Sequence, residues 1–167
     1  NTLYYSNFWM IPWGREQGLV IPRDGEPAVI APRIECDRPA KMVGDGSGFR
    51  DIRIYADNAS AIDGWVGLAQ QVLRDRGITK GRIGIEEDNV SITLHKALCA
   101  ALPDVEFTEM GYAMMCEQML KSDEEITLIR DGAEICDLGA QAFIDAVRDG
   151  VTEVQVARAS VTAMEEE

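Results

Sequence analysis

The chain has 167 residues, of which 46% are apolar and 27% are charged, and its formal net charge at pH 7 is −13. This acidic balance, without a stripe of Lys and Arg, argues against nucleic acid or an anionic membrane as partner and permits a basic protein partner. No apolar run approaches the roughly 18 to 20 residues that span a bilayer, and no signal-like amino terminus is visible, so we expect a cytoplasmic protein.

Short β-rich runs separated by turn signals fill the first third of the chain. The dipeptide Asp24-Gly25 lies between two such runs and is typical of a hairpin turn. The glycine-rich stretch 44–48 lacks the Lys-Ser/Thr of a phosphate-binding loop, so we interpret it as a flexible loop. The expected elements are strands at 18–22, 28–31 and 51–56 and a short helix at 34–43.

Helices and strands alternate from residue 60 to residue 120. Apolar residues recur at helical spacing between Ser60 and Arg76, and Gly77 then closes that helix. The expected elements are helices at 60–76, 90–102 and 111–120 and strands at 82–86 and 105–107. This alternation predicts an α/β fold with a mixed sheet flanked by helices.

The stretch from Met119 to Gly150 predicts a hinge followed by one long helix that Gly150 stops. Ser122 precedes an acidic first turn with Glu125 three residues later, which predicts a capping box, and Thr152 with Gln155 starts a second helix in the same way. We expect these helices to expose an apolar stripe, so that the chain dimerises or buries the stripe against the preceding domain. The stripe consists of Ile126, Ile129, Ala133, Cys136, Ala140, Phe143 and Val147.

The metal-ligating and nucleophilic side chains form no recognisable ligand set. His95, the only histidine, lies on the helix predicted at 90–102, and we expect a structural or solvated role for it. The acidic run 86–88 offers fewer oxygen ligands than a hard cation needs, so we expect a solvated corner with Asp88 or Asn89 capping the next helix. The cysteines lack CxxC spacing and are expected to be free buried thiols: Cys36, Cys99, Cys116 and Cys136.

Three segments, in this order along the chain, resemble the amino-terminal domain and domain junction of the creatinase/prolidase/aminopeptidase P family. They are GRIGIEEDN at 81–89, LPDVEF at 102–107 and KSDEEITLIR at 121–130. The resemblance implies that residues 1–121 form a small α/β domain resembling ribonuclease H, without its first helix and strand. It also implies that residues 122–167 are the start of a truncated catalytic domain of the pita-bread fold.

The start of the chain resembles the creatinase branch of this family. A Tyr-Tyr-Ser-Asn-Phe run at 4–8 precedes the triplet Trp13-Gly14-Arg15, as a similar run precedes an aromatic-Gly-Arg triplet in creatinases. The resemblance implies that Trp13 and Arg15 reach across a dimer and contact the substrate carboxylate in the neighbouring active site, a role suited to a forked guanidinium. The alternative is that Trp13 packs on the sheet and Arg15 is a solvated charge. Trp13 stands where creatinases have Phe, and Glu16 where they have Pro.

The resemblance implies three alternative functions. The first is the non-catalytic amino-terminal domain of a creatinase-like C–N hydrolase, of the creatine amidinohydrolase type, which contributes to dimerisation and to the neighbour's carboxylate pocket. The second is the same domain of a metal-dependent Xaa-Pro dipeptidase or aminopeptidase. The third is a non-catalytic protein-binding module of the same fold.

The resemblance places the catalytic machinery beyond Glu167. A peptidase would hold two divalent ions of Mn, Co or Zn there, whereas a creatinase would use a histidine base without metal. We expect no catalytic residue and no metal ligand within this chain, so the chain by itself is predicted to be inactive. The expected partners are a second copy of the protein and a small-molecule or dipeptide substrate, with neither nucleic acid nor membrane.

Overall fold

The computed structural model describes residues 2–8, 15–35, 37–43, 48–57 and 60–166. The chain divides into two compact units, Asn1–Tyr112 and Ala113–Glu167. The helix α5 (Gly111–Met119) contains the division, and the domain boundary after Lys121 stays a prediction. No helix in the described ranges is long and apolar enough to cross a membrane.

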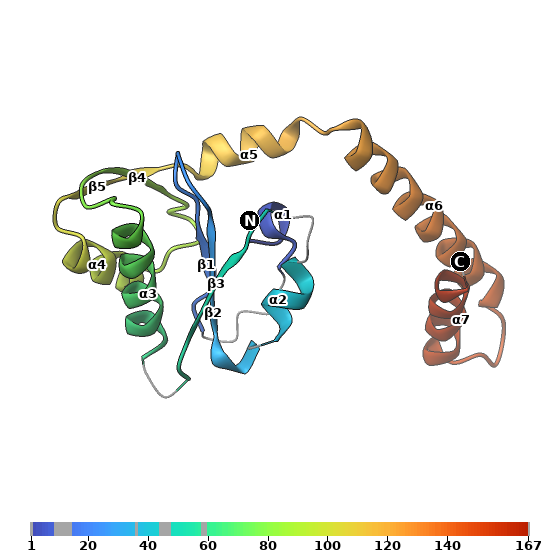
Figure 1. Cartoon of the computed structure of the whole chain (residues 1–167). Helices are drawn as coiled ribbons and strands as arrows, with labels where there is room; N and C mark the ends of the chain where they lie inside the picture. Colours follow the sequence, from blue (N-terminus) through green and yellow to red (C-terminus); the bar gives the residue numbers. More distant parts are fainter. Residues whose placement is uncertain (1, 9–14, 36, 44–47, 58–59, 167) are drawn as a thin grey trace. The chain divides into compact units, whose positions relative to one another are not determined.

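The described strands of the first unit belong to two sheets (Figure 1). In the first sheet, β2 (Ala28–Pro32) pairs antiparallel with β1 (Gly18–Val20) and parallel with β3 (Asp51–Tyr55), so the order is β1-β2-β3. In the second sheet, β4 (Gly81–Ile85) and β5 (Val105–Glu109) pair in parallel. The α/β class with a mixed sheet flanked by helices is therefore confirmed, and the antiparallel pairing of β1 and β2 agrees with the predicted hairpin.

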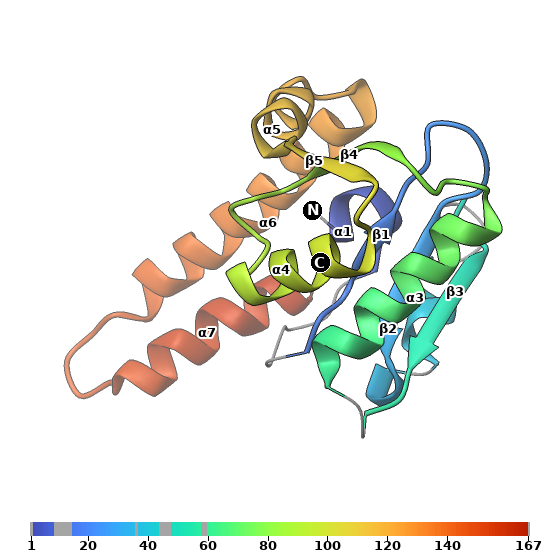
Figure 2. The ribbon, with the colours of Figure 1, turned by 90° about the vertical axis from the view of Figure 1, so that its left-hand side faces the viewer.

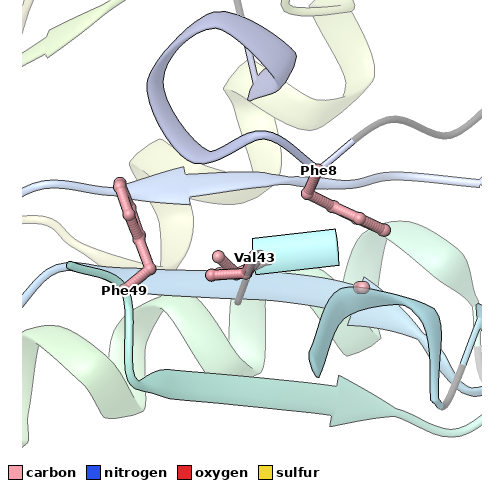
Figure 3. Close-up of a cluster of buried hydrophobic side chains, with 5 residues drawn as sticks. Phe8, Val43 and Phe49 are labelled. Atoms are coloured by element: carbon pink, nitrogen blue, oxygen red, sulfur yellow. The ribbon is translucent and has the colours of Figure 1, made fainter. Parts of the chain in front are cut away.

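The central strand β2 is buried along its whole length, because both faces of its sheet are covered. Val29 and Ala31 join one apolar cluster with Phe8, Val43 and Phe49 (Figure 3). On that face lie α1 (Thr2–Ser6) and α2 (Arg38–Val43), whereas α3 (Ala61–Asp75) covers the other face (Figure 1). The cluster under α3 consists of Ala28, Ile30, Tyr55, Ala69 and Val72. Burial on both faces explains why the strand is a continuous apolar run rather than an alternating one.

A third apolar cluster joins α3 to α4 (Ile92–Ala101). Its buried members are Val66, Leu73, Leu94, Leu98 and Leu102, and Ile83 of β4 and Phe107 of β5 pack against them. The Gln70 side chain of α3 also donates a hydrogen bond of 2.6 Å to the Ala101 carbonyl at the end of α4. This cluster therefore packs α4 and the second sheet against α3.

The helix α2 is shorter than the prediction for 34–43. A 3-10 turn at Arg33–Glu35 comes first, and α2 then runs over Arg38–Val43. Position 36 and most of the glycine-rich stretch, 44–47, lie outside the described residues. Pro39 at the second position of α2 fits this later start, because a proline is tolerated in the first turn of a helix.

A network of four charged side chains ties β3 to the end of α3. Arg53 contacts Asp51 at 2.9 Å and Asp75 at 2.8 Å, and Arg76 contacts Asp51 at 2.8 Å. Arg76 also donates to the Glu26 carbonyl at 2.6 Å, in the loop between β1 and β2. The network thus links the sheet, the carboxyl end of α3 and the hairpin loop.

The second unit contains a pair of antiparallel helices, α6 (Asp123–Ala146) and α7 (Glu153–Glu165), joined by a short turn (Figure 2). Both predicted capping boxes are present, Ser122 with Glu125 and Thr152 with Gln155. The predicted end of α6 at Gly150 is wrong. The backbone leaves the helix at Val147, which is extended, and Gly150 lies in the turn with a φ of 84°.

The helix pair buries little apolar surface. Between residues 113 and 166 the buried residues are Gly139 and Val156. A Cβ on Gly139 would lie 2.7 Å from the Met164 side chain, so this glycine marks the closest approach of the two helices. Much of the predicted stripe is exposed, as expected, including Phe143 at 48% and Val147 at 61%.

The expectation that the cysteines are buried is wrong for those that the structure describes. Cys99 and Cys136 are exposed and Cys116 is partly buried, and all three are free thiols. Cys136 lies on the stripe of α6 that α7 leaves uncovered, and Cys99 lies on α4 away from the face that carries Leu94 and Leu98. Cys36 is outside the described residues.

Candidate functional site

Arg15 lies beside the end of β3. Its Nη1 atom is 3.5 Å from Oδ1 of Asp57, two residues after the last residue of β3. The exposed fractions are 37% for the Arg15 side chain and 31% for that of Asp57, so both groups are accessible to water. Arg15 thus forms an ion pair while its side chain stays partly exposed. The other predicted site residue, Trp13, lies outside the described residues.

Tyr55 fixes the backbone next to Arg15. Its hydroxyl donates a hydrogen bond of 2.7 Å to the carbonyl of Glu16, and the residue, 4% exposed, packs under α3. Burial raises the pKa of Tyr55 to about 12, and the negative charge of Glu16 acts in the same direction. The phenol therefore stays protonated and keeps donating at neutral pH.

Glu16 is partly desolvated, and this burial raises the pKa of its carboxyl group. Its backbone accepts from Tyr55 on one side, and the next element, β1, begins at Gly18 and pairs with β2. Arg15 is therefore followed by a segment that is held at Glu16 and again from Gly18 onward. We call Arg15, Glu16, Tyr55 and Asp57 the Arg15 site.

The guanidinium of Arg15 has the chemistry to bind a carboxylate. A guanidinium has five N–H donors, and the 3.5 Å contact with Asp57 leaves most of them for a second carboxylate. Among the described residues, no group of three or more His, Cys, Asp or Glu side chains could hold a metal ion.

His95 and Cys99 form a contact that the sequence reasoning missed. Nε2 of His95 and Sγ of Cys99 lie 3.7 Å apart on α4, and the imidazole ring packs edge-to-face against Phe107 with centroids 5.7 Å apart. The four-residue spacing of His95 and Cys99 could have predicted this contact, because residues four apart on a helix are neighbours.

The helix α4, which follows the acidic corner after β4, has a different capping residue from the predicted one. Ser91, rather than Asp88 or Asn89, caps α4, and its hydroxyl accepts a hydrogen bond of 3.1 Å from the Leu94 N–H. A Cβ on Gly111 would lie 2.9 Å from Asp88 and 2.8 Å from Glu109, so the two carboxylates converge there. The Glu109 carboxylate accepts from the Tyr112 N–H at 3.0 Å, which gives it a structural role at the start of α5.

Comparison with known proteins gives a consistent group of matches. The profile of the Creatinase/Prolidase N-terminal domain matches residues 1–119. A creatinase from Bacillus sp. is 34% identical over 164 residues, which are 98% of this chain and 38% of that protein. An Xaa-Pro dipeptidase from Lactobacillus delbrueckii is 25% identical over 151 residues, 90% of this chain and 39% of that protein.

Solved structures show the same fold. An X-Pro aminopeptidase from Thermotoga maritima superposes with a TM-score of 0.72 at 21% identity, over 99% of this chain and 42% of that one. A prolidase from Pyrococcus furiosus superposes with a TM-score of 0.61 at 20% identity, over 99% of this chain and 42% of that one. The chain therefore spans about two fifths of the length of these proteins.

Proposed function

Because the chain belongs to the creatinase/prolidase family, whose amino-terminal domain it contains, we propose that it is the non-catalytic part of a creatinase-like hydrolase of C–N bonds. In this proposal the whole protein is of the creatine amidinohydrolase type and forms a homodimer. This chain contributes to the dimer contact and to the pocket for the substrate carboxylate in the neighbouring subunit.

The observation that carries the proposal is the way in which Arg15 is held. The Tyr55 hydroxyl fixes the adjoining backbone at 2.7 Å, Asp57 orients the guanidinium at 3.5 Å, and more than a third of the side chain remains accessible. A preorganised guanidinium binds a carboxylate with little loss of side-chain entropy. Trp13, two residues earlier, is proposed to flank the same carboxylate with its indole ring.

The relatives favour the creatinase branch by identity. The creatinase from Bacillus sp. is 34% identical to this chain, whereas the Xaa-Pro dipeptidases from two Lactobacillus species are each 25% identical. The alternative is the amino-terminal domain of a metal-dependent Xaa-Pro peptidase, which those dipeptidases support. A peptidase would need two divalent metal ions and a creatinase none, and residues outside this chain would hold the metal pair.

Turnover of two substrates by the whole protein tests the proposal. Creatine and an Xaa-Pro dipeptide are each supplied with and without a chelator. Creatine turnover that survives the chelator is the expected result. Cleavage of the dipeptide that the chelator abolishes would support the peptidase alternative, and no turnover of either would favour the binding module. Residues 1–167 alone are expected to turn over neither substrate, and activity of this fragment would contradict its non-catalytic role.

A further inference from the structure

Two side chains with nitrogen and sulfur donor atoms lie together on α4, outside the Arg15 site. Cys99 is a free, exposed thiol, and His95 stands one helical turn before it and is partly buried. Their donor atoms, Sγ and Nε2, are 3.7 Å apart. We call these two side chains the His95–Cys99 pair.

The pair is held on a rigid element. Ser91 caps the start of α4, and Gln70 of α3 bonds the carbonyl of Ala101 at its end. Leu94 and Leu98, each 5% exposed, anchor the neighbouring face of α4 in the third apolar cluster. The spacing of two ligands on such a helix is set before any ion binds, which lowers the entropy cost of binding.

The edge-to-face contact with Phe107 restricts the imidazole further. The two ring planes meet at 73°, with 5.7 Å between centroids, and Phe107 belongs to β5, a different element from α4. A contact from a second element limits rotation of the ring about its Cα–Cβ bond, so that Nε2 stays on the side of Cys99.

The separation of the two donor atoms matches the geometry of a tetrahedral metal ion. Zinc–nitrogen and zinc–sulfur distances of about 2.0 and 2.3 Å at a tetrahedral angle place the two donors about 3.5 Å apart. The observed 3.7 Å requires a movement of about 0.2 Å, which a small change of side-chain rotation supplies. The ion can therefore bind without a change in the helix.

We propose that the His95–Cys99 pair binds one borderline-soft divalent cation of the zinc class, with water in the remaining positions. Thiolate and imidazole ligands favour such ions over magnesium or calcium, which prefer oxygen. On binding, the thiol of Cys99 releases its proton to solvent as the metal–sulfur bond forms. The neutral imidazole binds through the lone pair of Nε2 and keeps its proton on Nδ1.

Cobalt(II) is a suitable probe, because a cobalt–thiolate bond has a charge-transfer absorption in the near ultraviolet. Titration of the 167-residue chain, kept reduced by a phosphine, should give this absorption with saturation at one ion per chain, and zinc should abolish it. Cys99→Ser should remove the absorption. His95→Gln should weaken the apparent affinity about tenfold or more, since it removes one of the two protein ligands.

Cys136→Ser is the matched control, because Cys136 is also an exposed thiol on a helix but has Gly132 four residues before it. This variant should keep the absorption unchanged. A second measurement does not depend on the variants: zinc should slow alkylation of Cys99 by iodoacetamide, in which the sulfur displaces iodide, and leave Cys136 unaffected. Three results would each overturn the proposal: no absorption at about 1 mM cobalt, absorption that persists in Cys99→Ser, or equal alkylation rates of Cys99 with and without zinc.

Discussion

Tyr55 connects the core of the first unit to the Arg15 site. Its ring belongs to the buried cluster between the sheet and α3, whereas its hydroxyl reaches the carbonyl of Glu16. The same residue therefore contributes to stability through its ring and to the position of Arg15 through its hydroxyl.

Replacing Tyr55 by Phe separates these two contributions. The ring stays in place, but the carbonyl of Glu16 loses a partly buried partner, so we expect the free energy of unfolding to fall by about 1–2 kcal/mol. Urea denaturation followed by tryptophan fluorescence measures this, because all three tryptophans lie in the first unit. Tyr112→Phe is the control: that side chain is 70% exposed, and its loss of a hydroxyl should change little. Equal effects of the two variants would refute the anchoring role of Tyr55.

Asp51 makes the stability of the first unit dependent on pH. Hydrogen bonds from Arg53, and after them from Arg76, hold the pKa of the Asp51 carboxyl group below its usual value. Because the folded-state pKa is lowered, the stabilisation is present above the unfolded-state value of about 3.9. It is lost as the pH falls through the lower, folded-state value.

The variant Asp51→Asn should therefore be less stable than the original protein at pH 7, and the difference should shrink as the pH falls below about 3.9. Unfolding free energies measured from pH 7 to pH 2.5 give the comparison. The control is Asp24→Asn in the exposed hairpin turn, for which we expect no such convergence. A difference that is constant with pH would contradict the role assigned to the ionised Asp51.

The helix α3 approaches β3 so closely at one point that only glycine fits. A Cβ on Gly64 would lie 2.8 Å from the Tyr55 ring, whereas a Cβ on Gly67, three residues later in the same helix, would meet nothing within 4 Å. Both glycines lie in the same helix, but only Gly64 has a side chain packed close against its Cα.

Alanine at these two positions should have opposite effects. Gly64→Ala should destabilise by about 1–3 kcal/mol, since the buried Tyr55 ring has to move. Gly67→Ala should stabilise by up to about 1 kcal/mol, because alanine favours the helix and no contact opposes it. Thermal and urea unfolding of both variants measure the effects. If Gly64→Ala proved as stable as Gly67→Ala, the close packing of α3 on β3 would be wrong.

Local patterns predicted the elements well where the determining contacts are local. The capping boxes at Ser122 and Thr152 need only residues three apart, and both are present. The predicted helix end at Gly150 and the predicted helix cap at Asp88 or Asn89 were wrong. Several neighbouring residues could end or cap each helix, and local spacing does not choose among them. Ser91 caps α4, and α6 ends before Val147.

Contacts between distant segments were not predictable from the sequence. The pairing of Arg15 with Asp57 and the bond from Tyr55 to Glu16 depend on how β1 and β3 flank β2. The exposure of Cys136 depends on which face of α6 the helix α7 covers. The contact between His95 and Cys99 is different: it follows from a four-residue spacing on one helix, and the sequence contained enough to find it.

At the scale of the whole molecule, the second unit leaves much apolar surface exposed. Exposed large apolar side chains of α6, α7 and the turn between them include Leu128, Ile129, Leu138, Phe143, Ile144, Val147, Val154 and Val161. Large apolar side chains exposed in this number on two helices favour an interaction surface. We therefore expect the 167-residue chain to associate with itself in solution.

Light scattering should show more than one chain per particle, and Ile144→Lys should reduce the association, because it places a charge on the exposed surface of α6. Ile92→Lys is the control: Ile92 is 76% exposed and lies in the first unit, compared with 64% for Ile144. A monodisperse monomer that binds a hydrophobic dye would contradict the predicted association.

The most direct test of the proposed function is the effect of Arg15→Ala on creatine turnover by the whole protein. We predict that kcat/KM falls about 100-fold or more, as expected when a carboxylate loses its guanidinium partner. The unfolding free energy should change by less than about 1 kcal/mol, because the ion pair with Asp57 is partly exposed. Arg23→Ala, in the exposed hairpin loop, should leave both unchanged. Creatine turnover that is unaffected by Arg15→Ala would contradict the assignment of Arg15 to the carboxylate pocket.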